Sequence, residues 1–300
     1  MRPSRSSRPR QLWSPRSRCG AGFSGSTFPT HFFTHGDFAL ANALIFGYGS
    51  TAVNFVRGDL VSYDLRDPTR PVPLGLLFNT PHSVFTNYVG SDYFIGQAAA
   101  KDGIVLLPST TGQDAAASGT GRLVFADART PGQVTTNGEF LVKGTRVLTA
   151  VAISGDRALV LGNSDGFTVS SGVPVLAGEV TASVLDVTDP LHPVVIGATR
   201  TLPSVDPAVR WKLHAFPGPD GLFFVSDVIQ DGKPALWVLD TSDPGHMETL
   251  AVELAGPVQF AEFKEGLLYT AGGSGMGIYD LGGLLGVPVV AGVEVPKEAN

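Results

Sequence analysis

The sequence predicts an all-β protein, a β-propeller built from four-stranded antiparallel blades, with at least five blades visible and further blades that could be missing. Three observations lead to this fold class: the composition, a recurring strand-and-turn phrase and a recurring hairpin signal. The 300 residues include 37 glycines and 22 prolines, and both residue types weaken helix interiors and favour turns. Hydrophobic residues make up 43% and charged residues 16%, which suits a packed core rather than a disordered chain.

The N-terminal segment differs from the rest in charge. Six arginines precede the first acidic residue, Asp37: Arg2, Arg5, Arg8, Arg10, Arg16 and Arg18. The segment lacks the apolar run of about 7–15 residues that a secretory signal contains. We expect residues 1–27 to be a basic disordered tail or a mis-assigned start, with an organelle-type presequence as a third reading. Residues 28–296 then form the propeller domain and 297–300 a C-terminal tail.

Two further features limit the class of protein. Cys19 is the single cysteine, so the chain can form no intramolecular disulfide. No stretch is long and apolar enough to predict a transmembrane segment.

A phrase of the form D-x-x-D-P follows apolar, β-rich runs. Good copies lie at residues 64–68, 186–190 and 240–244, and weaker copies at 127–131 and 280–283. An Asp at the first corner of a turn accepts backbone N–H groups two or three residues on, and Pro presets φ for the next corner. The phrase therefore predicts a strand that ends, turns and restarts. Metal binding or acid chemistry is the alternative, but the even distribution of these residues argues against one shared site.

A charged residue beside glycine marks a hairpin in each unit. Such pairs supply the positive φ that tight hairpins need, and five of them recur: Gly36-Asp37, Asp102-Gly103, Gly155-Asp156, Asp220-Gly221 and Glu265-Gly266. Each unit therefore reads strand, hairpin, strand, variable loop, strand, D-x-x-D-P turn, strand. Four antiparallel strands are the composition of a propeller blade.

The variable loops carry the insertions. Residues 109–121 and 163–179 are rich in Gly, Ser, Thr and Ala and precede the strand that ends in the key Asp. Insertions confined to one kind of loop lie on one face of a repeat array, where repeat proteins usually bind. The sequence therefore predicts a functional surface there.

The strand followed by D-x-[ST]-D-P-x-x-P, best seen in residues 184–193, resembles the LVIVD repeat of bacterial and archaeal surface proteins. The resemblance extends over roughly residues 28–296. It implies a β-propeller, an extracytoplasmic location and a role in binding without an assigned activity. The chain departs from the pattern in its long insertions and in showing no signal peptide.

Polar residues fall at matching places in the first strands of the units. Aligned on the hairpins, these are His31, His82 and His214, with Thr149 and Gln259 in the other units. Three histidines that converge at the central axis could bind a divalent metal such as zinc, iron or copper. Asp206 and Arg210 could line the same mouth. The alternative is that these side chains line a wet channel and hold no cofactor.

Function is therefore open among three classes. P-loop, G-x-S-x-G, H-E-x-x-H and dinucleotide motifs are absent from the sequence, so it names no catalytic residues. The favoured class is a non-catalytic binding module for a protein or a glycan, monomeric. The alternative is a metal-dependent or hydrolytic enzyme with its site at the central axis, and a structural surface protein is the third. The net charge of −6 argues against nucleic acid as a partner.

Overall fold

The computed structural model describes residues 24–35, 38–48, 53–70, 72–78, 82–83, 92–93, 97–111, 120–130, 135–170, 173–176, 178–203, 213–219, 221–253, 258, 260–272 and 275–281. These residues form β-strands and turns, with one short 3-10 helix, η2 (Pro244–His246), and no α-helix among them. In this part of the chain no helix is long and apolar enough to cross a membrane. The all-β prediction is confirmed.

The first two sheets follow the predicted order. The first contains β1 (Ser24–His35), β2 (Phe38–Tyr48), β3 (Val53–Asp64) and β4 (Val72–Phe78), each antiparallel to the next, and β5 (His82–Ser83) also pairs with β3. The second contains β7 (Ala99–Lys101), β8 (Ile104–Thr111), β9 (Thr120–Asp127) and β10 (Thr135–Lys143), with β6 (Asp92–Tyr93) also pairing with β8.

The next two sheets are four-stranded and antiparallel. The third contains β11 (Val147–Ser154), β12 (Arg157–Asn163), β15 (Val180–Asp186) and β16 (Val194–Thr201), and the inserted residues between β12 and β15 include a hairpin, β13 (Phe167–Ser170) with β14 (Val173–Leu176). The fourth contains β17 (His214–Pro217), β18 (Leu222–Gln230), β19 (Lys233–Asp240) and β20 (Glu248–Glu253).

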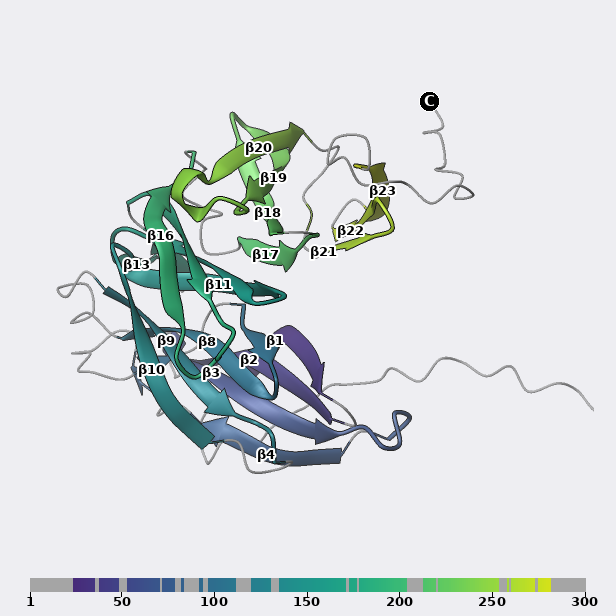
Figure 1. The fold of residues 1–300 in the computed structure, drawn as a ribbon. Helices are drawn as coiled ribbons and strands as arrows, with labels where there is room; N and C mark the ends of the chain where they lie inside the picture. Colours follow the sequence, from purple (N-terminus) through teal and green to yellow (C-terminus); the bar gives the residue numbers. More distant parts are fainter. Residues whose placement is uncertain are drawn as a thin grey trace, which may run out of the picture.

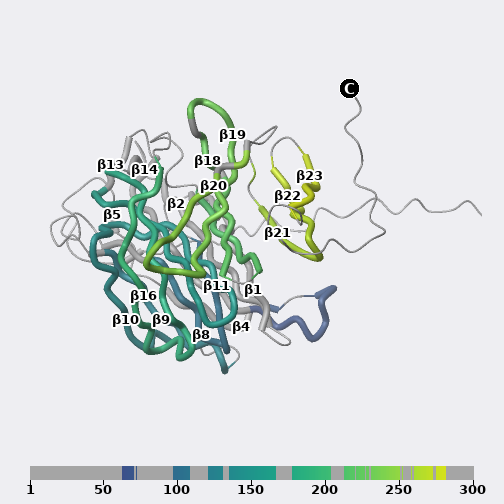
Figure 2. Tube along the Cα trace, turned by 45° about the horizontal axis from the view of Figure 1, so that its top comes forward, coloured from purple at the N-terminus to yellow at the C-terminus, as the bar shows by residue number. Residues whose placement is uncertain are grey.

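The fifth sheet contains β21 (Phe260–Lys264), β22 (Leu267–Gly272) and β23 (Gly275–Asp280). The residues after Leu281, where the unit pattern predicts a fourth strand, lie outside the described residues, as do residues 1–23 and the expected tail at 297–300. At the other end, β1 begins at Ser24, slightly before the predicted start of the propeller at residue 28. The second to fifth sheets follow one another in space as in the chain (Figures 1 and 2), and β3 of the first sheet contacts β6 of the second.

Three of the predicted charged-Gly pairs are described in full, and each joins two antiparallel strands: Asp102-Gly103, Gly155-Asp156 and Glu265-Gly266. Asp102 and Gly103 have φ of 51° and 75°, and Glu265 and Gly266 have 54° and 83°. Residues with positive φ at both corners match the twist of two adjoining strands. A further pair of this kind, Asp231-Gly232, joins β18 to β19.

The D-x-x-D-P phrases are turns whose carboxylates bind their own backbone. The first Asp of the phrase accepts the N–H group two residues on in four units, as in Asp186 with Thr188 at 2.8 Å and Asp240 with Ser242 at 2.8 Å. The second Asp does the same, as in Asp189 with Leu191 at 3.0 Å. The structural reading of the phrase is confirmed in these turns.

Apolar side chains lie between successive sheets. Leu159 and Val184 of the third sheet pack with Phe223 and Trp237 of the fourth, all at most 1% exposed. Similar cores join the second sheet to the third and the fourth to the fifth. Because the third and fourth sheets each bury both faces against neighbouring sheets, the second to fifth sheets are stacked as blades.

The innermost strands of successive blades lie side by side. Gln97, just before β7, forms a parallel bridge with Ala150 of β11, in which its N–H donates to the Thr149 carbonyl at 3.0 Å and its carbonyl accepts from the Val151 N–H at 2.8 Å. Strand β17 lies between β11 and β21. First strands that meet at a common centre are the defining arrangement of a propeller.

Candidate functional site

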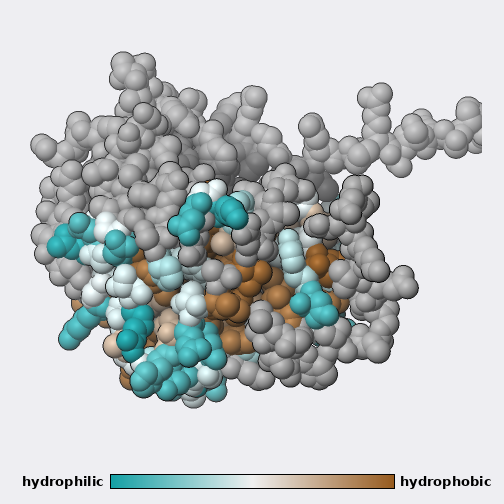
Figure 3. Space-filling model, turned by 90° about the horizontal axis from the view of Figure 1, so that it is seen from above, coloured by the Kyte–Doolittle hydropathy of each residue, from teal (hydrophilic) through white to brown (hydrophobic). Residues whose placement is uncertain are grey.

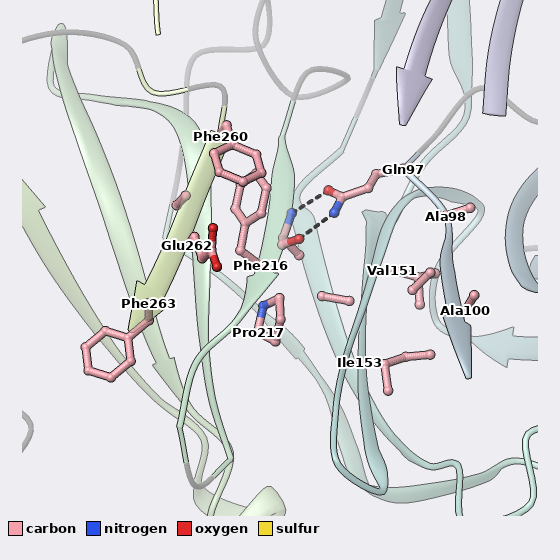
Figure 4. Close-up of a pocket in the computed structure, with 14 residues that line it drawn as sticks. Gln97, Ala98, Ala100, Val151, Ile153, Phe216, Pro217, Phe260, Glu262 and Phe263 are labelled. Atoms are coloured by element: carbon pink, nitrogen blue, oxygen red, sulfur yellow. Dashed lines mark hydrogen bonds between the residues drawn. The ribbon is translucent and has the colours of Figure 1, made fainter. Parts of the chain in front are cut away.

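A cavity of about 430 Å³ lies where these innermost strands meet. Its 14 lining residues come from four blades: β7 with Gln97, β11, β17 and β21 (Figure 4). Most of them are Ala, Val, Ile, Pro or Phe. From above, the apolar side chains of the described surface gather in its middle and the polar ones toward its edge (Figure 3). A mostly apolar cavity of this size is typical of a small-molecule site.

Gln97 holds one side of the cavity together. Its side-chain Nε2 donates to the Ala215 carbonyl at 2.5 Å, and its Oε1 accepts from the Ala215 N–H at 2.8 Å. The side-chain amide thus pairs with β17 as a neighbouring strand would, while the backbone of the same residue pairs with β11. Gln97 is 5% exposed, and both ends of its amide are bonded within the wall.

Phenylalanines form the opposite side. Phe216 of β17 and Phe260 of β21 meet edge to face, with ring centroids 5.5 Å apart and planes at 71°. Phe263 stacks on Phe224 of the core at 5.8 Å. Phe260 is 49% exposed, so part of its ring is open to a ligand.

Glu262 is the one ionisable side chain among the 14 lining residues. It lies on β21 between Phe260 and Phe263, on the same face of the strand as Phe260 (Figure 4). The side chain is exposed. The backbone of Glu262 pairs with Tyr269 of β22, but within the described part of the chain its carboxylate has neither a hydrogen bond nor an ion pair.

In β11 the residues that line the cavity lie in the half of the strand nearer the hairpin. The cavity lining extends from Gln97 to Ala100, two residues before the Asp102-Gly103 turn, and reaches Ile153 just before the turn at Gly155. The inserted hairpin β13–β14 follows the second strand of its blade and is therefore at the opposite end of the strands. The sequence predicted a functional surface at the inserted loops, and that surface and the cavity are at opposite ends of these strands.

Two of the predicted axial residues lie at one level of the structure. Gln97 pairs with Ala150 of β11 and bonds to Ala215 of β17. Thr149 and His214 are each one residue earlier on these two strands. The Thr149 hydroxyl is buried and has no partner in the described structure. Partial burial lowers the pKa of His214, which favours the neutral imidazole. The cavity lining begins past both residues.

The other two histidines lie in the first sheet. His31 is in β1, as expected for a first strand, and pairs with Asn42. His82 is in β5 and pairs with Val56 of β3, so the alignment that placed it in the first strand of the second unit is corrected. That first strand is β7, which ends at Lys101 and is too short to include His82.

The remaining candidates, Asp206, Arg210 and Gln259, lie outside the described residues. Among the residues that are described, no group of three or more His, Cys, Asp or Glu side chains could hold a metal ion. The metal hypothesis for His31, His82 and His214 stays a prediction.

Sequence reasoning missed Gln97, Phe216, Phe260 and Glu262. The signals that could have found two of them are weak: Gln97 precedes a run of three alanines, and Glu262 interrupts an apolar strand shortly before the Glu265-Gly266 hairpin. Neither pattern indicates which residues meet at the centre.

Comparison with known proteins identifies no relative in sequence. No family model matches the chain, and no curated protein matches it. Among solved structures, a GH43 endo-arabinanase from Bacillus licheniformis is similar with a TM-score of 0.39 and 12% identity, covering 83% of this chain and 91% of that one. The propeller assignment rests on the blades themselves and on the way their first strands meet.

Proposed function

We propose that this protein is a non-catalytic binding module that holds its ligand in the central cavity. The observation that carries the proposal is the lining: four blades converge on it, yet only Glu262 among its 14 residues can ionise. Glycoside hydrolysis usually needs two carboxylates, and zinc catalysis needs three protein ligands. An apolar wall with few polar groups suits binding driven by burial of apolar surface.

We also infer that the chain is related to the LVIVD-repeat proteins and works outside the cytoplasm. The support is the turn itself, since Asp186 and Asp240 begin turns of the same construction in successive blades. Both inferences agree with a binding role, because the resemblance to LVIVD-repeat proteins implies such a role.

The proposal is tested by filling the cavity. Ala100, half-buried in β7, lines the cavity, and Ala100→Phe should occupy its space. We expect small aromatic fragments detected by saturation-transfer NMR to bind the wild type and to lose at least tenfold in affinity with the variant. Pro217→Trp, at an exposed lining position of β17, should act in the same way and guards against misfolding of the first variant.

Ala198→Phe serves as the matched control, because Ala198 is exposed on the outer strand β16. It should bind fragments as the wild type does. Fragment binding that survives both cavity-filling changes would contradict the proposal. Turnover of a bound fragment or glycan would instead support the enzyme alternative.

A further inference from the structure

We infer that the central cavity selects a small organic ammonium ion, with an apolar body and one positively charged nitrogen. The inference rests on the proposed function and names the ligand class for the same site. A cavity of about 430 Å³ has room for a small molecule.

Charge gives the first reason. Glu262 places a carboxylate in a wall whose other 13 residues carry no charge. Lys264, on the same strand, does not line the cavity. Although the Glu262 side chain is exposed, it is the one charged lining group that can attract a cation, and no positively charged side chain lines the cavity to compete for it.

The aromatic side chains give the second reason. A cation within about 6 Å of a ring face is attracted by the negative face of the ring. Phe216 and Phe260 meet at 71°, so their faces point in different directions, and Glu262 follows Phe260 by two residues on β21, which places both side chains on one face of the strand. An ammonium group at the carboxylate would thus lie near aromatic rings, with its apolar body against the alanines and Val151.

The small number of polar side chains in the lining argues against an anion or a sugar as the ligand. Gln97 and Glu262 are the only lining residues with polar side chains, and the Gln97 amide is already bonded to Ala215. The Gln97 amide uses one of its two N–H groups on the Ala215 carbonyl, so the lining side chains offer an anion at most one buried N–H and no positive charge. A sugar would leave most of its hydroxyls without side-chain partners, which is costly once they are buried.

Three probes of similar size separate the effect of ligand charge from the burial of an apolar ring. Benzylamine, benzyl alcohol and benzoate share a ring and differ in charge at neutral pH. We expect isothermal titration of the full chain to show benzylamine binding about tenfold tighter than benzyl alcohol, with benzoate weakest. Added salt should weaken the binding of benzylamine more than that of benzyl alcohol.

Glu262→Gln keeps the shape of the side chain and removes its charge. It should weaken benzylamine binding about tenfold and leave benzyl alcohol binding unchanged. Glu248→Gln makes the same change at an exposed position of the outer strand β20 and should alter neither.

The outcomes distinguish the two proposals. If benzyl alcohol binds as tightly as benzylamine, and cavity-filling variants abolish both, the cation inference fails and the binding function stands. If Glu262→Gln leaves benzylamine binding unchanged, the cation inference fails as well. If none of the probes binds, both proposals are overturned for ligands of this size.

Discussion

At the scale of single residues, the carboxylates of the D-x-x-D-P turns stabilise the backbone that carries them. In the third and fourth blades the second Asp also contacts a histidine three residues on, Asp189 with His192 at 2.7 Å and Asp243 with His246 at 3.0 Å. In the first and second blades the first Asp binds an arginine instead, as Asp127 does Arg129. The aspartates and the exposed turn histidines therefore bond to groups within their own turns.

These bonds favour the charged carboxylate. Hydrogen bonds from Thr188 hold the pKa of Asp186 below its ordinary value, and the His192 side chain lowers the pKa of Asp189 most strongly. A carboxyl group whose pKa is lower in the folded than in the unfolded protein stabilises the fold fully above the unfolded pKa. That contribution is lost as the pH falls through the folded pKa.

Asp186→Asn tests whether the charge of the Asp186 carboxylate stabilises its turn. Asparagine can still accept the Thr188 N–H but cannot carry charge, so the variant should be less stable than the wild type at pH 7. The gap should close as the pH falls from about 5 to about 3, where the wild-type carboxylate becomes protonated. Urea unfolding midpoints across that range measure it. A gap that stays constant or widens toward low pH would contradict this account of the turn.

At the scale of elements, the third and fourth blades are joined by close contacts between the outer strand β16 and the turn at η2. Gly197 of β16 has φ of 80°, and a Cβ atom there would lie 2.2 Å from the Pro244 carbonyl oxygen of η2. Arg200 of the same strand donates to the Gly245 carbonyl. The third and fourth blades approach this closely because Gly197 has no side chain.

Gly197→Ala therefore tests the contact between blades, with Gly232→Ala as its control. Gly232 has φ of 77°, and a Cβ atom added there would have no neighbour within 4 Å. Both changes should cost about 1 kcal/mol for the backbone conformation, and Gly197→Ala should cost about 1–3 kcal/mol more for the clash. Urea denaturation gives both values. Equal losses in the two variants would mean that the blades do not touch at Gly197.

The sequence could predict these elements because their causes are local. A charged residue beside glycine sets a hairpin within two residues, and an Asp-based turn is complete within five. His82 shows where this approach failed: its strand could be assigned only by counting back from Asp102, and the structure places His82 in β5, which pairs with β3 of the first sheet.

At the scale of the whole molecule, the centre depends on contacts that no local pattern encodes. Gln97 and Ala215 are 118 positions apart in the chain, yet they join the second blade to the fourth while the backbone of Gln97 joins the third. Further bonds connect neighbouring hairpins, such as Lys101 Nζ to the Gly155 carbonyl at 3.2 Å and Ser154 Oγ to the Gly218 carbonyl at 2.9 Å. The cavity and Glu262 follow from this meeting of strands, so sequence alone could suggest an axial site but not its lining.

The most direct test of this centre is hydrogen exchange at the Ala215 amide. Its N–H donates to the Gln97 side chain, so it should exchange slowly in the wild type and much faster in Gln97→Ala. Amides between β18 and β19, which pair within one blade, should change far less. Such a selective loss would support blades that meet around one cavity. An Ala215 amide that exchanges freely in the wild type, or equally slowly in both proteins, would contradict it.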